Sequence, residues 1–340
     1  MDTFSLEEMY KHNEGSVNLE YYESLNEKKL VQIKKHPIFP LSLLNYTQKA
    51  QFKGKWSTEL LLARGLVVNH DGVIVARPLP KIFNDYELSH IPTGEFEVFE
   101  KLDGSLIIMS FYKGKPFFCT RGSFTSEQSL KAKEIYDEKY SNQIVDQNYT
   151  YCFEIIYPQN KIIIDYAEEE DLFLLCKIHT HSGKEVGILN TGFRCVKHLN
   201  HYKNLKELKG DDKVNEEGYV VKFKENNFRI KIKFQSYVKL QKNSRLTRSQ
   251  IVKLLQYGKE IPFDDIPDEC FEELNKTVND IKAKFIQNKR WLVEEFENIV
   301  RSSSKEGDII NTIKSKSNQK ILFNIYRKKN YDHLIWNQLL

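Results

Sequence analysis

The sequence has no run approaching the ~20 consecutive apolar residues that a membrane-spanning helix requires. Its N-terminal stretch is acidic and lacks an apolar core, so no secretory signal is predicted. The five cysteines lie far apart without a CxxC pair, which argues against a zinc ribbon and against a dense disulfide framework. These absences favour a soluble, unprocessed protein of the reducing cytoplasm that does not contact a membrane.

A strong excess of charge of one sign is also missing. The 51 basic and 47 acidic residues give a formal net charge of +4 over 340 residues. So small an excess permits binding to nucleic acid but does not demand it. No GxxxxGK[ST] phosphate-binding loop, internal repeat or low-complexity tract occurs. The length predicts two domains with a sizeable core.

Residues 60–244 are patterned mainly as short strands separated by polar turns. Turn pairs such as Asp71-Gly72, flanked by β-branched residues, are typical of antiparallel hairpins. The first of these strands is expected in 61-LLARGLVVN-69. One helix is predicted over residues 126–140, which open with a serine cap and contain no glycine or proline. We therefore expect an α+β region built of antiparallel sheets with helices.

After residue 244 the pattern becomes helical. Apolar residues recur at spacings of three, four or seven along 271–299, the stripe of a long amphipathic helix that starts near Pro267. A polar break at 302–308 separates it from further helical patterns. The sequence thus predicts a first domain of residues 1–244 and an all-helical C-terminal domain of residues 245–340.

Lys101 and Asp103 interrupt a stretch that otherwise alternates like a strand, 97-EVFEKLDGSLIIMSF-111. Gly104 allows a turn directly after them, which a Cβ atom would hinder. A KxDG sequence alone is common by chance, and an exposed turn lysine is its usual explanation. Its weight as a functional signal therefore depends on the charged residues further along the chain.

Four charged residues occur downstream in order on predicted strands or strand ends, namely Glu154, Glu217, Lys231 and Lys233. A lysine that attacks phosphorus must be neutral, and cationic neighbours favour that form, so Lys101 is the candidate nucleophile. The two glutamates could hold a hydrated Mg²⁺, because magnesium prefers oxygen ligands and retains waters. The two later lysines share one strand face and could neutralise a phosphate. The set suits covalent nucleotidyl transfer, although solvated strand glutamates are the plainer explanation of each carboxylate alone.

Together these motifs resemble the ATP-dependent RNA ligases, and most of all the type-1 RNA ligases of tailed phages within the covalent nucleotidyltransferase superfamily. The matching motifs are 101-KLDG-104, 120-TRGS-123, 153-FE-154, 217-EGYVV-221 and 231-KIK-233. An upstream signature, 63-ARGLVV-68 and then 76-ARPLPKIFN-84, narrows the resemblance from the whole superfamily to the type-1 RNA ligases. The resemblance covers roughly residues 40–240 and implies a nucleotidyltransferase (ATP-grasp-like ligase) domain.

The resemblance also implies the site residues. The catalytic set would be Lys101, Asp103, Glu154, Glu217, Lys231 and Lys233, with the metal on Glu154 and Glu217. ATP would be contacted by Tyr46, Arg64, Lys81, Phe83, Glu100, Lys101, Arg121, Glu154, Glu217, Lys231, Lys233 and Tyr237. Asp103 is expected near the nucleophile or metal-bound water, and the backbone near Glu100 is expected to read adenine. Phe173 is a candidate to stack on the base, but the sequence leaves that residue open.

The activity implied by the resemblance has three steps. Lys101 would attack ATP to give lysyl-AMP and pyrophosphate, AMP would pass to an RNA 5′-phosphate, and a 3′-hydroxyl would displace it. ATP and Mg²⁺ (or Mn²⁺) are the expected cofactors, and RNA with 3′-hydroxyl and 5′-phosphate ends, such as a nicked tRNA, is the expected partner. End healing by a kinase and phosphatase is expected from another protein. If the chain is phage-encoded, its compartment would be the host cytoplasm.

Two alternatives remain open. DNA ligases and GTP-using capping enzymes share these motifs but carry an OB-fold after them, whereas here a helical domain is predicted, for which the resemblance implies selection of the RNA. A catalytically silent RNA-binding protein could keep the same fold. The charged residues of all five motifs are present, which argues against a protein without catalytic activity, because charges are costly to hold at a site without a partner.

Overall fold

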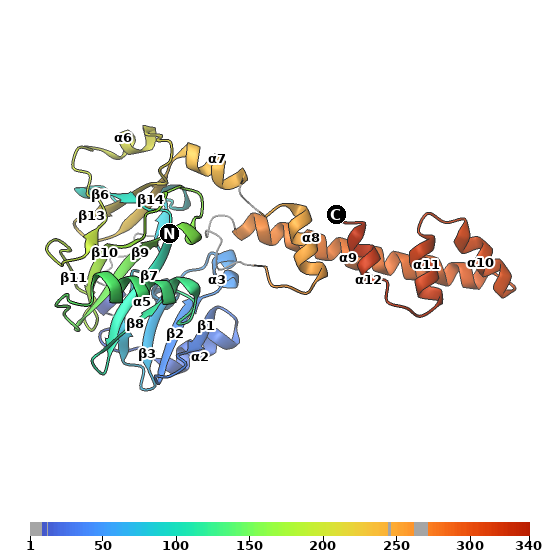
Figure 1. Cartoon of the computed structure of the whole chain (residues 1–340), viewed down its shortest axis with the longest axis horizontal. Helices are drawn as coiled ribbons and strands as arrows, with labels where there is room; N and C mark the ends of the chain where they lie inside the picture. Colours follow the sequence, from blue (N-terminus) through green and yellow to red (C-terminus); the bar gives the residue numbers. More distant parts are fainter. Residues whose placement is uncertain (1–8, 12, 244–245, 262–270) are drawn as a thin grey trace. The chain divides into compact units, whose positions relative to one another are not determined.

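The computed structural model describes residues 9–11, 13–243, 246–261 and 271–340. The chain divides into two compact units, Met1–Ser244 and Arg245–Leu340 (Figure 1). The first combines antiparallel sheets with helices, and the second is helical throughout its described part. The predicted α+β class with a helical C-terminal region is therefore confirmed.

Within its described residues the first unit contains three sheets. The order β1-β2-β3-β4 is formed by β1 (Val31–Lys35), β2 (Leu41–Tyr46), β3 (Arg64–Asn69) and β4 (Ile74–Ala76). The order β11-β10-β9-β7-β8, with β12 beside β10, is formed by β7 (Ser105–Tyr112), β8 (Lys115–Cys119), β9 (Tyr149–Ile156), β10 (Asp171–His179), β11 (Glu185–Val186) and β12 (Arg194–Cys195). The order β5-β14-β13-β6 is formed by β5 (Phe83–Asn84), β6 (Phe96–Lys101), β13 (Gly218–Phe223) and β14 (Arg229–Lys233).

The helices of the first unit connect and flank these strands. They are α2 (Leu19–Glu27), α3 (Gln48–Lys53), α4 (Thr58–Leu62), α5 (Glu127–Lys139), α6 (Leu205–Gly210) and α7 (Gln235–Asn243), with 3₁₀ turns η1 (Asp85–Glu87) and η2 (Pro158–Asn160). Helix α5 confirms the predicted helix, and the Ser126 hydroxyl caps it by accepting a hydrogen bond from the Ser129 N–H at 3.3 Å. The strand expected in 61–69 is wrong at its start, because Leu61 and Leu62 belong to α4, which Ser57 caps.

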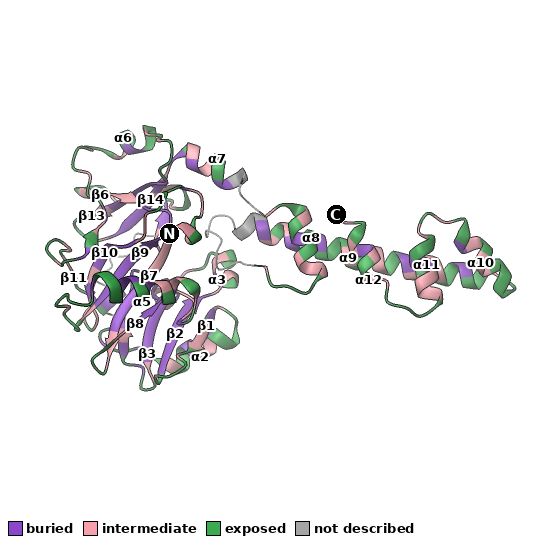
Figure 2. Cartoon of the chain, in the orientation of Figure 1, coloured by how far each residue is buried: buried purple, intermediate pink, exposed green. Residues whose placement is uncertain are grey.

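In the sheet β5-β14-β13-β6, the alternation of side chains along each strand decides which residues share a face. Its core side is apolar and buried, and includes Val98, Tyr219, Val221, Ile230 and Ile232. In Figure 2 its strands carry both buried and partly exposed residues. Residues one position away in each strand point to the opposite side. Gly218 pairs in register with Lys101 of β6 and with Lys233 of β14. The strand pattern therefore places both lysines on the face away from the core.

The second unit is built around one long helix. Its elements are α8 (Arg248–Gln256), α9 (Phe271–Ser302), α10 (Glu306–Lys314), α11 (Gln319–Tyr326) and α12 (Asp332–Asn337). One apolar cluster joins α8 to the first half of α9, and another joins the second half of α9 to α10, α11 and α12. The predicted helix start near Pro267 lies outside the described residues. No helix in the described part of the chain has the length and apolar character needed to cross a bilayer.

Arg77 ties the N-terminal segment to the turn between β10 and β11. Its side chain is buried, with Nε donating to the Thr180 carbonyl at 2.9 Å. Its Nη2 donates to the carbonyls of Asn13 at 2.6 Å and His181 at 3.0 Å. The guanidinium also lies over the Tyr10 ring, 5.2 Å from its centroid. One planar guanidinium fork thus satisfies three carbonyls from two segments, Asn13 near the N-terminus and the adjacent Thr180 and His181 in the turn.

Replacing Arg77 by lysine should lower the free energy of unfolding by about 2–4 kcal/mol, because an ammonium cannot reproduce the fork and leaves buried carbonyls unpaired. Denaturant unfolding of the full chain measures this. Arg290→Lys is the matched control, since the Arg290 side chain is 81% exposed and its loss should stay within about 0.5 kcal/mol. Equal stability of the two variants would show that the tether contributes nothing.

Candidate active site

Glu217 lies between two lysines. The Nζ of Lys101 is 2.6 Å from its Oε2, and the Nζ of Lys233 is 3.0 Å from its Oε1. Glu217 directly precedes Gly218, the residue that pairs with both lysines across the sheet. The carboxylate is 3% exposed and the Lys233 side chain 5%, so these charges are largely out of water. Buried charges of this kind are stable only while both signs are present.

Glu154 comes to the same place from the second sheet. Its Oε1 accepts a hydrogen bond from the Gly104 N–H at 3.1 Å. A Cβ atom on Gly104 would lie 2.3 Å from the Ile155 carbonyl oxygen, so only glycine fits this close approach. Burial raises the pKa of Glu154 to about 7, opposed by Lys101 and reinforced by Glu217. This carboxyl therefore changes protonation near neutral pH when no metal is bound.

Asp103 is buried in the 101-KLDG-104 motif, and both of its carboxylate oxygens accept hydrogen bonds. Its Oδ1 accepts a hydrogen bond from the Tyr237 hydroxyl at 2.7 Å, and its Oδ2 accepts from the N–H groups of Ile163 at 2.8 Å and Ile164 at 2.9 Å. Its own N–H donates to the Tyr166 hydroxyl at 2.8 Å. The carboxylate and Tyr237 thus fix the turn directly after Lys101, and the expectation that Asp103 contacts the surroundings of the lysine or metal-bound water stays a prediction.

Lys81 lies in an aromatic cage. Its Nζ is 5.0 Å from the ring centroids of Trp56 and Phe83 and 5.7 Å from that of Tyr46. The Tyr46 hydroxyl accepts a hydrogen bond from Nη1 of Arg121 at 3.2 Å. Four residues predicted to contact ATP are therefore neighbours. Trp56, the remaining wall of the cage, belongs to no motif, and the sequence analysis missed it.

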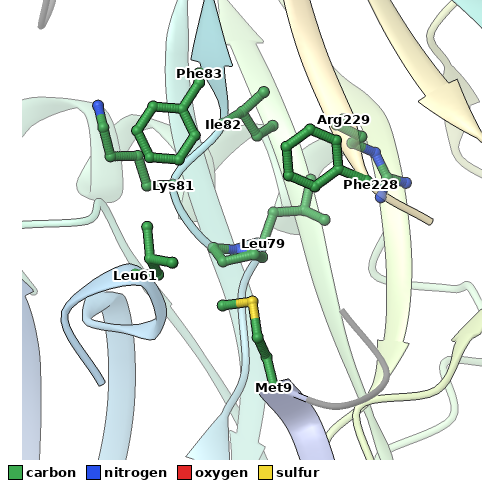
Figure 3. Close-up of a pocket in the computed structure, with 9 residues that line it drawn as sticks. Met9, Leu61, Leu79, Lys81, Ile82, Phe83, Phe228 and Arg229 are labelled. Carbon is green, nitrogen blue, oxygen red and sulfur yellow. The ribbon is translucent and has the colours of Figure 1, made fainter. Parts of the chain in front are cut away.

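A small, mainly apolar pocket lies beside the segment that carries Lys81 and Phe83 (Figure 3). Its lining residues are Met9, Leu61, Leu79, Pro80, Lys81, Ile82, Phe83, Phe228 and Arg229. Lys101, Glu154 and Glu217 do not line it. This pocket therefore includes two of the predicted ATP contacts, Lys81 and Phe83, but none of the charged cluster around Glu217.

Three further predicted contacts lie on the first and third sheets. Arg64 begins β3, is partly exposed and pairs in register with Asn45. Lys231 lies on β14 two residues before Lys233, so the two share a strand face. The backbone N–H of Glu100 donates to the carbonyl of Lys197 at 3.1 Å, and the expectation that the backbone near it reads adenine stays a prediction.

Phe173, the candidate for stacking on the base, is buried on β10. The guanidinium of Arg194 lies over its ring, 4.4 Å from the centroid. One face of this ring is therefore already covered, and stacking there would require Arg194 to move.

Comparison with known proteins gives relatives among RNA ligases. A protein from Autographa californica nuclear polyhedrosis virus, named as a bifunctional polynucleotide kinase/RNA ligase, is 27% identical over 263 residues, which cover 65% of this chain and 36% of the relative. A protein from Thermovibrio ammonificans, named as an RNA ligase, is 25% identical over 177 residues, 49% of this chain and 43% of the relative. The chain thus spans less than half the length of these curated relatives.

Among solved structures, a mutant of Naegleria gruberi RNA ligase with ATP and Mn is 15% identical, with a TM-score of 0.34 and coverage of 42% of this chain and 50% of that one. A protein from Aquifex aeolicus named as an ATP-dependent DNA ligase is 16% identical, with a TM-score of 0.44 and coverage of 92% and 100%. The family model described as RNA ligase matches residues 62–237, just over half of the chain. On that match, the chain belongs to the RNA ligase family.

Proposed function

We propose that this chain is an ATP-dependent RNA ligase that joins 3′-hydroxyl and 5′-phosphate ends through a lysyl-AMP intermediate. The observation that carries the proposal is the contact of 2.6 Å between Nζ of Lys101 and Oε2 of Glu217. Membership of the RNA ligase family supports RNA as the substrate. The reaction needs a lysine that can pass its proton to a neighbouring base and that lies near another cation, and Glu217 and Lys233 supply these two groups.

In the first step, Lys101 passes a proton to Oε2 of Glu217 and its lone pair attacks the α-phosphorus of ATP. The bond from that phosphorus to the pyrophosphate oxygen breaks, and pyrophosphate leaves. Lys233, bound to the other carboxylate oxygen at 3.0 Å, remains positive and offsets the charge on the phosphoryl oxygens. AMP then passes from the lysine to the RNA 5′-phosphate. Finally the 3′-hydroxyl attacks that phosphate, and AMP leaves.

Glu154 and Glu217 are the residues that would hold Mg²⁺ or Mn²⁺. Glu154 uses one oxygen for Gly104, and its other oxygen makes no hydrogen bond within the described residues. A magnesium ion commonly takes one or two carboxylates and keeps several waters, which fits a pair of glutamates. A divalent ion here would stabilise negative charge on the phosphates. Glu217 would have to share its oxygens between the ion and the lysines.

The RNA partner is proposed to be a broken strand such as a nicked tRNA, selected by the helical unit. Residues 309–340 contain six lysines and arginines and a single acidic residue, Asp332, which suits a polyanion. The ends are proposed to be healed by a kinase and phosphatase outside these 340 residues, which contain no GxxxxGK[ST] loop. A cytoplasmic location is proposed because the described cysteines are free thiols.

Lys101→Arg should abolish labelling of the protein by α-labelled ATP. Arginine keeps the charge that Glu217 needs, but it cannot lose a proton near neutral pH to become a nucleophile. The measurement is acid-labile radioactivity on the purified protein after incubation with Mg²⁺ and ATP. Lys115→Arg, at the exposed first residue of β8, is the control and should be labelled like the wild type. Label on the Lys101 variant would overturn the proposal.

The same assay separates the competing functions. Label from GTP in place of ATP would assign the chain to capping-type nucleotidyl transfer. If neither nucleotide labels a folded protein that still binds RNA, the silent RNA-binding function is favoured.

Glu154 should make stability and metal binding depend on pH. Its pKa is raised from 4.5 to about 7 on folding, so its contribution to stability is fully present below about 4.5 and is lost as pH rises through 7. The measurement compares the unfolding free energy of the metal-free wild type with that of metal-free Glu154→Gln. The difference, wild type minus variant, should fall by about 2 kcal/mol from pH 5 to pH 8. Affinity for Mn²⁺ should rise over the same range, because the ion needs the ionised carboxyl. The control is Glu134→Gln, at an exposed side chain, for which this difference should not change with pH. The same constant difference for Glu154→Gln would contradict the prediction.

A chain ending at residue 244 should retain adenylate formation, because the contacts described around Lys101, Glu217 and Asp103 all lie within the first unit. Its preference among RNA substrates should change. The measurement compares labelling by ATP with sealing of nicked tRNA and of unstructured RNA. A soluble truncated chain that cannot form the adenylate would show that the domain division is wrong.

A further inference from the structure

The segment between Tyr46 and Trp56 carries an exposed phenylalanine among lysines. Phe52 is 66% exposed, one of the most exposed aromatic side chains in the described part of the chain. Lys49, Lys53 and Lys55 are also exposed, and residues 47–58 contain no acidic side chain. An apolar ring left in water at this level often marks an interaction site when polar groups surround it.

Helix α3 explains why these side chains point outward. Thr47 caps the helix by accepting a hydrogen bond from the Ala50 N–H at 3.4 Å. Ala50 is 1% exposed and packs into the core, which turns positions 49, 52 and 53 to the opposite side. Gly54, at φ +61°, then ends the helix in a left-handed conformation. The ring and two lysines therefore share one face of a short, firmly capped helix.

Two further lysines extend this surface. The Lys49 Nζ donates to the Lys28 carbonyl at 2.9 Å, and the Thr47 hydroxyl donates to the Lys29 carbonyl at 2.6 Å. The side chains of Lys28 and Lys29 are exposed. We call the whole surface the α3 platform, and its members are Lys28, Lys29, Lys49, Phe52, Lys53 and Lys55.

The α3 platform adjoins the candidate site through both ends of its segment. Tyr46 before it and Trp56 after it are walls of the cage around Lys81. Tyr46 also accepts the hydrogen bond from Arg121. The inner side of the segment therefore faces predicted ATP contacts, while its outer side carries the exposed lysines and the exposed ring.

We infer that the α3 platform binds the single-stranded RNA next to the reacting end, with a base stacked on Phe52 and phosphates on the lysines. This inference rests on the proposed function and adds a substrate contact outside the ATP machinery. Aromatic rings within a basic surface are the usual platform for single-stranded nucleic acid, because every base has a face to stack. A protein partner fits less well, since lysine is depleted from protein interfaces.

The test uses the full chain and a fluorescent, 5′-phosphorylated oligocytidylate, with the dissociation constant measured by anisotropy over a range of KCl concentrations. Phe52→Ala should weaken binding about tenfold, the effect of losing one stacked base, whereas Phe52→Tyr keeps a ring and should bind within about twofold of wild type. Replacing Lys49, Lys53 and Lys55 together by glutamine should reduce the slope of log affinity against log salt by about 2.

Matched controls are exposed residues elsewhere. They are Tyr86→Ala, at an aromatic side chain of the first unit that is 69% exposed, and the triple change of Lys113, Lys115 and Lys184 to glutamine. Both should bind RNA like the wild type. If the platform variants also do so, or if Phe52→Tyr binds as poorly as Phe52→Ala, the inference is overturned.

Labelling by ATP separates this inference from the proposed function. Platform variants that form the adenylate normally but bind RNA poorly support the platform. Platform variants that cannot form it would place these residues in the ATP site and overturn the inference. A wild-type chain that binds RNA through the platform but forms no adenylate would support the platform while the ligase function fails.

Discussion

The candidate site depends on a single buried carboxylate, Glu217, shared by Lys101 and Lys233. Removing either lysine would leave a charge poorly paired in a region nearly closed to water, which is costly. The same contact that holds the sheet edge together also provides a base for the proposed nucleophile. Stability and reactivity at this site are therefore coupled through one side chain, and the register of β6, β13 and β14 fixes its geometry.

Two sheets contribute carboxyl groups that have different neighbours. Glu217 comes from the sheet with the lysines and is paired with both of them, whereas Glu154 comes from the other sheet and has a pKa raised by burial to about 7. One carboxyl group that is paired with two lysines and another that is buried in the facing sheet can take different tasks. Gly104 keeps the sheets this close, because any side chain there would collide with the backbone of β9.

Periodicity and residue order in the sequence could predict local features of the fold and site. Strand alternation placed Lys231 and Lys233 on one face, and the cap at Ser126 marked helix α5. The sequence could not predict contacts between distant segments, such as Trp56 beside Lys81 or Tyr237 on Asp103, because no local pattern encodes them. The helix that begins after Ser57 was missed because the apolar run beyond it also suits a strand.

The cage around Lys81 also gives the molecule a built-in optical reporter. Trp56 is the one tryptophan before residue 245, since the other two are Trp291 and Trp336. Its indole lies 5.0 Å from a positive charge, and the field of such a charge shifts the colour and intensity of indole emission. Any molecule that draws the ammonium toward itself would change that field. Arrival of an anion beside Lys81 would therefore change the intrinsic fluorescence without a dye or an engineered label.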